Sequence, residues 1–155
     1  MALEIERKYL VINDKWRDSV VGESVMKQGY LANQANATVR VRVSGGEARL
    51  TIKGRSRGIS RSEYEYPIPL QDAQELLESH RAGALIEKVR YRVRCGDHVW
   101  DLDVFDGANR GLVIAEVELG SEDEAFQMPE WAGEEVSSDS RYYNASLVSH
   151  PYCDW

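Results

Sequence analysis

The sequence predicts a mainly β (α+β) fold, an eight-stranded antiparallel closed β-barrel with a charged interior and a few short helices outside. Hydrophobic and polar residues alternate with a period of two along much of the chain, as side chains do along a strand. Glycine-containing turns join successive alternating segments, and short turns of this kind connect antiparallel neighbours. One face of these segments is almost wholly charged, whereas a face open to solvent usually also carries Ser, Thr, Asn and Gln.

Five strands are expected in the first half of the chain, because polar and apolar residues alternate there between turn-forming residues. Ser44-Gly45-Gly46 has the composition of a hairpin turn, and residues 54–60 have that of a mobile basic loop. The expected strands are residues 2–12, 27–31, 37–43, 47–53 and 61–68.

The period changes after residue 69 and then returns to two. Leu76 and Leu77 among acidic residues predict an amphipathic helix over 70–80, and Gly96-Asp97 predicts a turn between two later strands. Strands are expected at 87–94, 98–105 and 111–119, a helical piece at 122–126 and a helix at 140–149.

Composition limits the classes of function that the protein can have. The chain has 155 residues, which fits one domain spanning 1–155, and 26 acidic against 19 basic residues give a net charge of −7. An acidic protein repels nucleic acid and anionic membranes, so neither partner is expected. The sequence has no membrane-spanning apolar stretch and no signal peptide, and its two cysteines form no CxxC motif. We therefore expect a cytoplasmic protein with reduced thiols.

The charged face of the strands is the strongest indication of function. A solvated face explains charges on any one strand, but here acidic and basic residues are also segregated by strand. A barrel with charges inside and hydrophobic residues outside explains the whole set, and its narrow interior would need a matching ligand or metal. The set is Glu4, Glu6 and Lys8; Arg40 and Arg42; Arg49 and Lys53; Arg61, Glu63 and Glu65; Lys88, Arg90 and Arg92; Asp101 and Asp103; Glu116 and Glu118.

The residue types on this face suit a complex of polyphosphate with a divalent cation. Lys binds phosphate as a point charge and Arg binds it as a bidentate fork. Paired carboxylates suit hard cations such as Mg²⁺ or Mn²⁺. Together they predict hydrolysis of a phosphoanhydride, in which metals offset the developing charge and help to generate hydroxide.

The sequence resembles the CYTH family, also called triphosphate tunnel metalloenzymes, over nearly its whole length. Residues 4–8 match the family's ExExK motif at the N-terminus, and further matches follow in order. The resemblance is greatest to short bacterial members that act mainly on inorganic triphosphate. The other matches are Gln28-Gly29-Tyr30-Leu31, Arg40-Val41-Arg42, Thr51-Ile52-Lys53, Glu63-Tyr64-Glu65, Lys88-Val89-Arg90, Asp101-Leu102-Asp103-Val104-Phe105, Glu116-Val117-Glu118 and Asp139-Ser140-Arg141-Tyr142-Tyr143-Asn144.

The resemblance implies a role for each matching residue and a metal-dependent hydrolysis of inorganic triphosphate. It implies that Mg²⁺ or Mn²⁺ is the cofactor, that Lys8 and Tyr30 take part in catalysis, and that the C-terminal helix lies at one tunnel end. The implied metal ligands are Glu4, Glu6, Glu116 and Glu118. The implied triphosphate ligands are Lys8, Arg40, Arg42, Lys53, Lys88 and Arg90, with Glu63, Glu65 and Asp103 as supporting acids.

Several alternatives stay open on the sequence. Class IV adenylate cyclases and thiamine triphosphatases use the same tunnel on nucleoside or thiamine triphosphates, and a polyphosphate-binding module without turnover is a third possibility. Water could be activated by a metal or by the Lys8/Tyr30 pair, and the oligomeric state is not predicted. Asp101 is a weaker candidate than Asp103 because it lies nearer the Gly96-Asp97 turn. Arg61 could guide an anion to the tunnel mouth, but loop arginines are usually ordinary surface residues. Arg92 is a weaker candidate than Lys88 and Arg90, because arginines at strand ends are commonly solvated.

Overall fold

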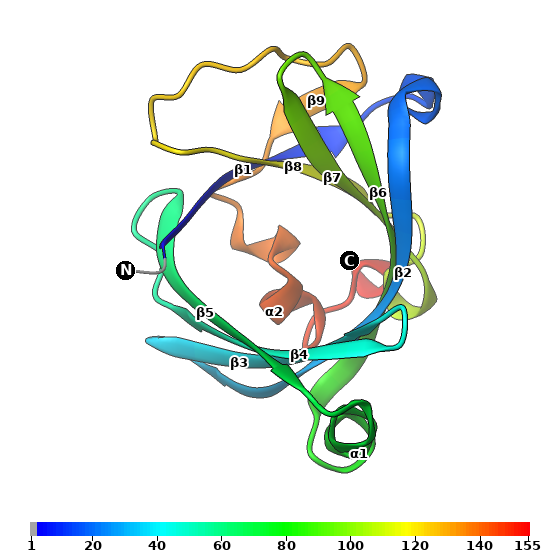
Figure 1. Ribbon diagram of the computed structural model, residues 1–155, viewed down its shortest axis with the longest axis vertical. Coiled ribbons are helices and arrows are strands. Elements are labelled where there is room, and N and C mark those ends of the chain that lie inside the picture. The colour runs from blue at the N-terminus through cyan, green and yellow to red at the C-terminus, as the bar shows by residue number, and fades with distance from the viewer. Residues whose placement is uncertain (1–2) are drawn as a thin grey trace.

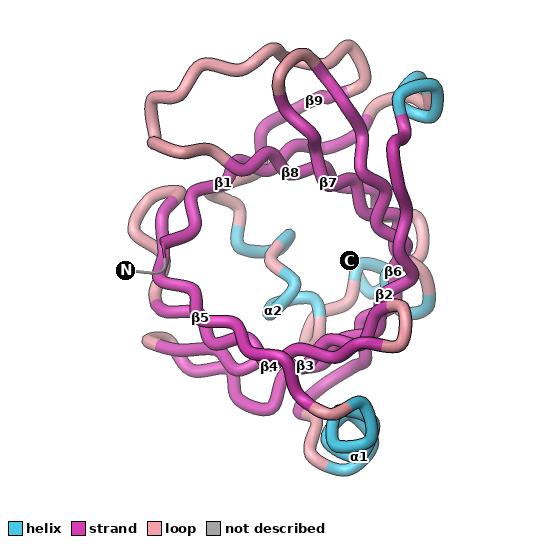
Figure 2. Tube along the Cα trace, viewed as in Figure 1, coloured by secondary structure: helices cyan, strands magenta, loops and turns pink. Residues whose placement is uncertain are grey.

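Eight antiparallel strands form a closed barrel in the computed structural model, which describes residues 3–155 (Figures 1 and 2). The order around the barrel is β5-β4-β3-β2-β6-β7-β8-β1, and pairing of Leu3–Ile5 with Ser60–Ser62 closes the ring between β1 and β5. The predicted fold class is thereby confirmed. The strands are β1 (Leu3–Val11), β2 (Val20–Gln34), β3 (Ala37–Ser44), β4 (Glu47–Gly54), β5 (Ser60–Ile68), β6 (Ala82–Cys95), β7 (His98–Phe105) and β8 (Val113–Glu118).

A ninth strand, β9 (Ala132–Glu135), extends the barrel wall without belonging to the ring. It pairs with β1 at Tyr9 and Val11, on the edge whose first residues pair with β5. β1 therefore needs two partners along that edge, one for each half of its length. Residue 2 of the predicted first strand lies outside the described residues.

Hydrophobic side chains on the outer faces of several strands are covered by other elements. The helix α1 (Leu70–Ser79) lies against β3 and β4 (Figure 1). Its Ala73 and Leu77 pack against Val41 of β3 and Ala48 of β4. Around β1, β7 and β8, a larger cluster includes Trp16 of the 3-10 helix η1 (Lys15–Ser19). Burial of this apolar surface stabilises the barrel at roughly 25 cal/mol per Å². The polar faces of the same strands are therefore left to line the interior.

The C-terminal segment closes one end of the barrel. The helices η3 (Ser140–Tyr142) and α2 (Asn144–Leu147) are seen inside the ring when the molecule is viewed along its axis (Figure 1). Val148 accepts a 2.8 Å hydrogen bond from the backbone N–H of Ala84 in β6. Gly83 allows this approach, because its φ is +76° and a Cβ there would lie 2.6 Å from the Val148 carbonyl oxygen. The buried apolar residues at this end are Tyr30, Ile86, Phe105, Leu112, Ile114, Leu147 and Val148.

Several expected elements differ from those in the structure. The strand at 27–31 is the middle of β2, and β6 begins at Ala82 rather than at residue 87. The helical piece at 122–126 is wrong, because those residues form a turn and loop, and the helix at 140–149 is reduced to η3 and α2. The remaining short helices are η2 (Gly107–Asn109) and η4 (Tyr152–Asp154). Within residues 3–155, no helix has the length and apolar character needed to cross a membrane.

Candidate active site

A polar cavity of about 180 Å³ occupies the barrel interior. Its wall contains six basic and seven acidic residues, with Tyr30, Thr38, Tyr143, Asn144 and Ala145 completing it. So dense a set of charges in so small a volume is costly unless the charges offset one another or meet a ligand. The charged residues are Lys8, Arg40, Arg42, Lys53, Arg61, Arg90, Glu4, Glu6, Glu63, Glu65, Asp101, Glu116 and Glu118.

Strand order places an acidic wall opposite a basic one. Glu4 and Glu6 of β1 adjoin Glu116 and Glu118 of β8, because Glu6 pairs with Glu118 and Lys8 pairs with Glu116. Arg40 and Arg42 come from β3 and Arg90 from β6, the two strands that flank β2, whereas Arg61 comes from β5 beside β1. The cavity can therefore hold a cation on the β1/β8 side while phosphate oxygens face β3 and β6.

The guanidinium groups of the basic wall lie close enough to repel one another. Burial and the adjacent guanidinium groups of Arg40 and Arg90 lower the pKa of Arg42 to about 9. Arg40 donates a hydrogen bond to Thr51 Oγ1 at 3.2 Å, but its buried Nε has no partner among residues 3–155. An anion between these side chains would relieve both conditions.

On the acidic wall, buried carboxylates lie close enough to repel one another. Burial and the nearby carboxylates of Glu116 and Glu4 raise the pKa of Glu6 well above its ordinary value. Burial, followed by the charge of Glu4 and then that of Asp101, also raises the pKa of Glu118. A divalent cation among these oxygens would relieve the repulsion, so the donor set fits Mg²⁺ or Mn²⁺.

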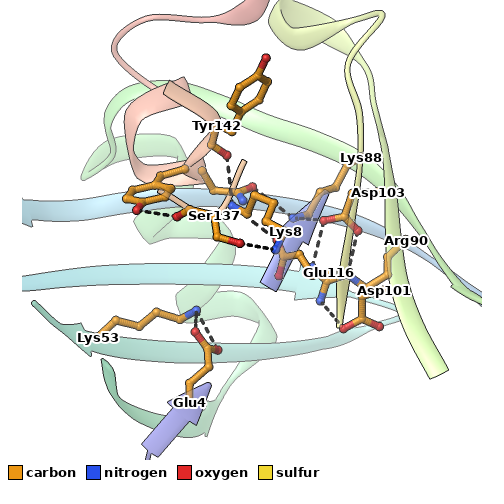
Figure 3. Close-up of polar contacts among 12 residues, drawn as sticks. Glu4, Lys8, Lys53, Lys88, Arg90, Asp101, Asp103, Glu116, Ser137 and Tyr142 are labelled. Carbon is orange, nitrogen blue, oxygen red and sulfur yellow. Dashed lines mark hydrogen bonds and ion pairs between the residues drawn. The ribbon is translucent and has the colours of Figure 1, made fainter. Parts of the chain in front are cut away.

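Protein cations hold some of these carboxylates in the structure. Lys53 Nζ lies 3.0 Å from Glu4 Oε1 and 3.3 Å from Glu63 Oε2, and Arg61 Nε lies 3.4 Å from Glu4 Oε1 (Figure 3 shows the first pair). Burial alone would raise the pKa of Glu4, but Lys53 and Arg61 contribute to a net lowering. Within residues 3–155, no three acidic, histidine or cysteine side chains are already grouped to hold a metal. Metal binding would therefore exchange these ion pairs for metal–oxygen bonds.

Lys8 lies where the cavity meets the closed end of the barrel. Its Nζ donates a hydrogen bond to the Tyr142 carbonyl oxygen at 3.2 Å, lies 3.6 Å from Glu116 Oε1 and lies 5.3 Å from the centroid of the Tyr143 ring (Figure 3 labels Lys8, Tyr142 and Glu116). Tyr30 lines the same cavity and is 5% exposed. The two predicted catalytic side chains thus share one cavity, although β1 and β2 are not neighbours in the barrel.

Lys88 and Asp103 lie behind the cavity wall. Lys88 Nζ is 2.8 Å from Asp103 Oδ2, and their side chains are 0% and 3% exposed. Asp103 also accepts two hydrogen bonds from Arg90, at 2.8 Å from Nε and 3.0 Å from Nη2 (Figure 3). Burial alone would raise the pKa of Asp103, but Arg90 and Lys88 hold it well below its ordinary value. Arg90 does line the cavity, and its hydrogen bonds to Asp103 on the side away from the cavity therefore fix its position.

All but two of the predicted site residues line the cavity, and those two are Lys88 and Asp103. Asp101, the weaker sequence candidate, lines the cavity, and so does Arg61, interpreted from sequence as surface. Thr38 could have been found from sequence, because it shares the face of Arg40 two residues away. Tyr143 and Asn144 lie in the family match at residues 139–144, but no alternating pattern marks them as site residues, because they enter from the C-terminal segment rather than from a strand.

Comparison with known proteins agrees with this architecture. The model of the CYTH domain family matches residues 2–152. An inorganic triphosphatase of Acetivibrio thermocellus is 45% identical over 152 residues, covering 98% of this chain and 97% of that protein. An inorganic triphosphatase of Nitrosomonas europaea is 39% identical over 149 residues, covering 94% of this chain and 96% of that protein.

A solved structure is similar to this chain in both sequence and fold. The crystal structure of the inorganic triphosphatase NE1496 superposes with a TM-score of 0.69 at 36% sequence identity. The match covers 96% of this chain and 95% of that chain. A match of fold, family model and sequence over nearly the whole length leads to one assignment: this chain belongs to the CYTH domain family.

Proposed function

We propose that this protein hydrolyses inorganic triphosphate to orthophosphate and pyrophosphate with the help of a divalent cation, Mg²⁺ or Mn²⁺. The observation that carries the proposal is the cavity in which β3 and β6 present arginines opposite the glutamates of β1 and β8. Two relatives, 45% and 39% identical over nearly the whole chain, bear the name inorganic triphosphatase, which supports the proposal.

The basic wall would bind the phosphate chain. Arg40, Arg42, Lys53 and Arg90 line the cavity and present fork-shaped or point-like donors to phosphate oxygens. A bound phosphate would supply the partner that Arg40 Nε lacks and would favour the charged form of Arg42. These groups would also stabilise the charge that shifts toward the bridging oxygen as the phosphoanhydride bond breaks.

The carboxylates of Glu4, Glu6, Glu116 and Glu118 would hold the metal. A bound divalent cation supplies charge neutralisation for phosphate oxygens and lowers the pKa of coordinated water. Glu63, already paired with Lys53, and Glu65, paired with Arg40 and Arg49, would keep the basic side chains oriented in the free protein. Asp103 would do the same for Arg90.

Lys8 and Tyr30 would act at the reacting phosphate. Lys8 lies beside Glu116 on the acidic wall, and Tyr30 of β2 lies next to Arg40 of β3 in the strand register. A phosphoryl group lying between the two walls would meet both side chains. We propose that they orient the attacking water and assist proton transfer as its oxygen bonds to phosphorus and the phosphoanhydride P–O bond breaks.

The decisive experiment measures phosphate release from triphosphate with Mg²⁺ or Mn²⁺. Glu4→Gln and Lys8→Ala should each lower the rate by at least about a hundredfold, because each removes a group at the reacting centre. The matched controls are Glu130→Gln and Lys15→Ala, since that exposed ion pair joins the same residue types outside the cavity. Wild-type rates in both Glu4→Gln and Lys8→Ala would refute the mechanism.

A substrate panel separates the proposal from its alternatives. Triphosphate, ATP and thiamine triphosphate should be compared under one condition, with products identified by chromatography. We expect the highest kcat/KM for triphosphate; cyclic AMP from ATP would instead support a cyclase, and binding without phosphate release a non-catalytic module. We further propose that residues 1–155 form one domain. We also propose that the protein is cytoplasmic, and fractionation of cells tests this location.

A further inference from the structure

Asn144 connects the closed end of the barrel to two strands at once. Its side-chain Oδ1 accepts a hydrogen bond from Gln28 Nε2 at 3.2 Å and another from Lys88 Nζ at 3.1 Å. Gln28 belongs to β2 and Lys88 to β6, and both residues are buried. One amide oxygen therefore serves two buried donors that no solvent reaches, which makes its removal costly to both.

The first connection leads to Arg42. Gln28 Oε1 accepts a 2.8 Å hydrogen bond from Arg42 Nε, so its amide group is used at both ends. Gln28 is 0% exposed, and its amide can rotate only by giving up one of these bonds. Arg42 is thus held through Nε while its guanidinium lines the cavity.

The second connection leads to Arg90. Lys88 Nζ contacts Asp103 Oδ2 at 2.8 Å, and the Asp103 carboxylate accepts both hydrogen bonds from Arg90. Lys88 and Asp103 do not line the cavity, whereas Arg90 and Asn144 do (Figure 3 labels Lys88, Asp103 and Arg90). The path from Asn144 to Arg90 therefore runs through side chains held away from solvent.

We propose that Asn144 is a positioning residue that fixes Arg42 and Arg90 at the spacing needed for triphosphate, acting through Gln28 on one side and Lys88 on the other. This inference rests on the proposed function and assigns Lys88 an indirect part in substrate binding. The neutral amide suits the task, because it accepts from both donors without adding negative charge to an anion-binding wall.

Other contacts fasten the C-terminal segment independently of Asn144. Leu147 is fully buried, Val148 bonds to Ala84, and Asn33 Nδ2 donates a 2.8 Å hydrogen bond to the Ala145 carbonyl oxygen. Asn33 also lies on β2, so its bond joins the same strand to the same helix. It has no link to either arginine among the hydrogen bonds of residues 3–155, which makes Asn33→Ala the matched control.

The test compares Asn144→Ala with Asn33→Ala in triphosphate hydrolysis with Mg²⁺. For Asn144→Ala we expect KM to rise about tenfold or more, with kcat changed less than about threefold, because misplaced arginines weaken binding in the ground and transition states alike. Asn33→Ala should keep both constants near wild type, and the melting temperature of each variant reports on folding. Equal kinetic effects of the two substitutions would overturn the inference.

Gln28→Met provides a second variant that removes only the Arg42 connection. We expect KM to rise about threefold, and the double variant with Asn144→Ala to fall short of the product of the single effects, because the two residues share a bond. Full independence in that cycle would overturn the inference. If Asn144→Ala fails to fold, the inference is tested with Gln28→Met alone, and an unchanged KM in that variant would overturn it.

Binding of triphosphate without metal, measured by calorimetry, separates this inference from the proposed function. Absence of hydrolysis by the wild-type protein would refute the function. The positioning effect would still appear as weaker triphosphate binding by Asn144→Ala than by Asn33→Ala.

Discussion

Asp103 is the residue whose removal should damage the barrel most directly. It is the common counterion of Lys88 and Arg90, at 2.8 Å from each, and its side chain is 3% exposed. Asp103→Asn keeps the shape and removes the charge. The buried Lys88 and the partly buried Arg90 then lose their shared counterion, and the amide can accept only some of their hydrogen bonds.

The expected cost follows from that burial. Removing one partner of a buried ion pair destabilises proteins by about 3–5 kcal/mol. For a chain of this size, each kcal/mol lowers the melting temperature by about 2–4 °C. Asp103→Asn should therefore melt about 6–20 °C below the wild type at pH 7. It should also hydrolyse triphosphate more slowly, because Arg90 loses the carboxylate that fixes its position.

The effect has a defined dependence on pH. Arg90 and Lys88 hold the pKa of Asp103 below its ordinary value in the folded protein, whereas in the unfolded chain it lies at about 4. As the pH falls below about 4, the unfolded chain binds the proton first, so the wild type loses this stability. The difference between wild type and Asp103→Asn should therefore narrow in acid.

Thermal unfolding followed by circular dichroism measures both effects. The control is Asp106→Asn, because the Asp106–Arg110 ion pair has the same chemistry with side chains 66% and 78% exposed, and its loss should leave the melting temperature unchanged. An Asp103→Asn variant that melts within 2 °C of wild type at pH 7, on this scale of about 2–4 °C per kcal/mol, would refute the reasoning.

Three further predictions concern the cavity and its closed end. Glu6→Gln should raise the melting temperature at pH 7 in the presence of a chelator, because burial and the neighbouring carboxylates raise the pKa of Glu6, and it should slow metal-dependent hydrolysis. This gain should shrink as the pH falls toward the raised pKa, and a lower melting temperature would contradict it. Leu147→Ala should destabilise the fold by about 2–5 kcal/mol, since Leu147 is 0% exposed, while Val25→Ala at a 67% exposed site should not. Removal of divalent cations with a chelator should abolish phosphate release, and Mg²⁺ or Mn²⁺ should restore it; full activity without metal would show that the acidic wall serves another purpose.

The alternating charged face was sufficient to predict the barrel, because a period of two fixes which side chains share a face. The prediction of strand bounds failed where the two faces of a strand do not differ in polarity. On the outer face of β2, Val21 and Val25 alternate with Glu23 and Lys27, so residues 20–26 show no separation of polar from apolar positions. β9 is four residues long and pairs with β1, which lies more than 100 residues earlier in the chain. A local sequence pattern cannot indicate such a pairing.

The sequence by itself determined which side chains face the interior, from Glu4 and Glu6 on β1 to Glu116 and Glu118 on β8, because that depends only on position along each strand. Only the tertiary structure decided how deep each charge lies. Lys88 and Arg90 occupy the same face of β6, yet Arg90 lines the cavity while Lys88 is covered by Asp103 and the C-terminal segment. Depth is set by what packs across the barrel, and Asn144 reaches Lys88 from 56 residues further along the chain.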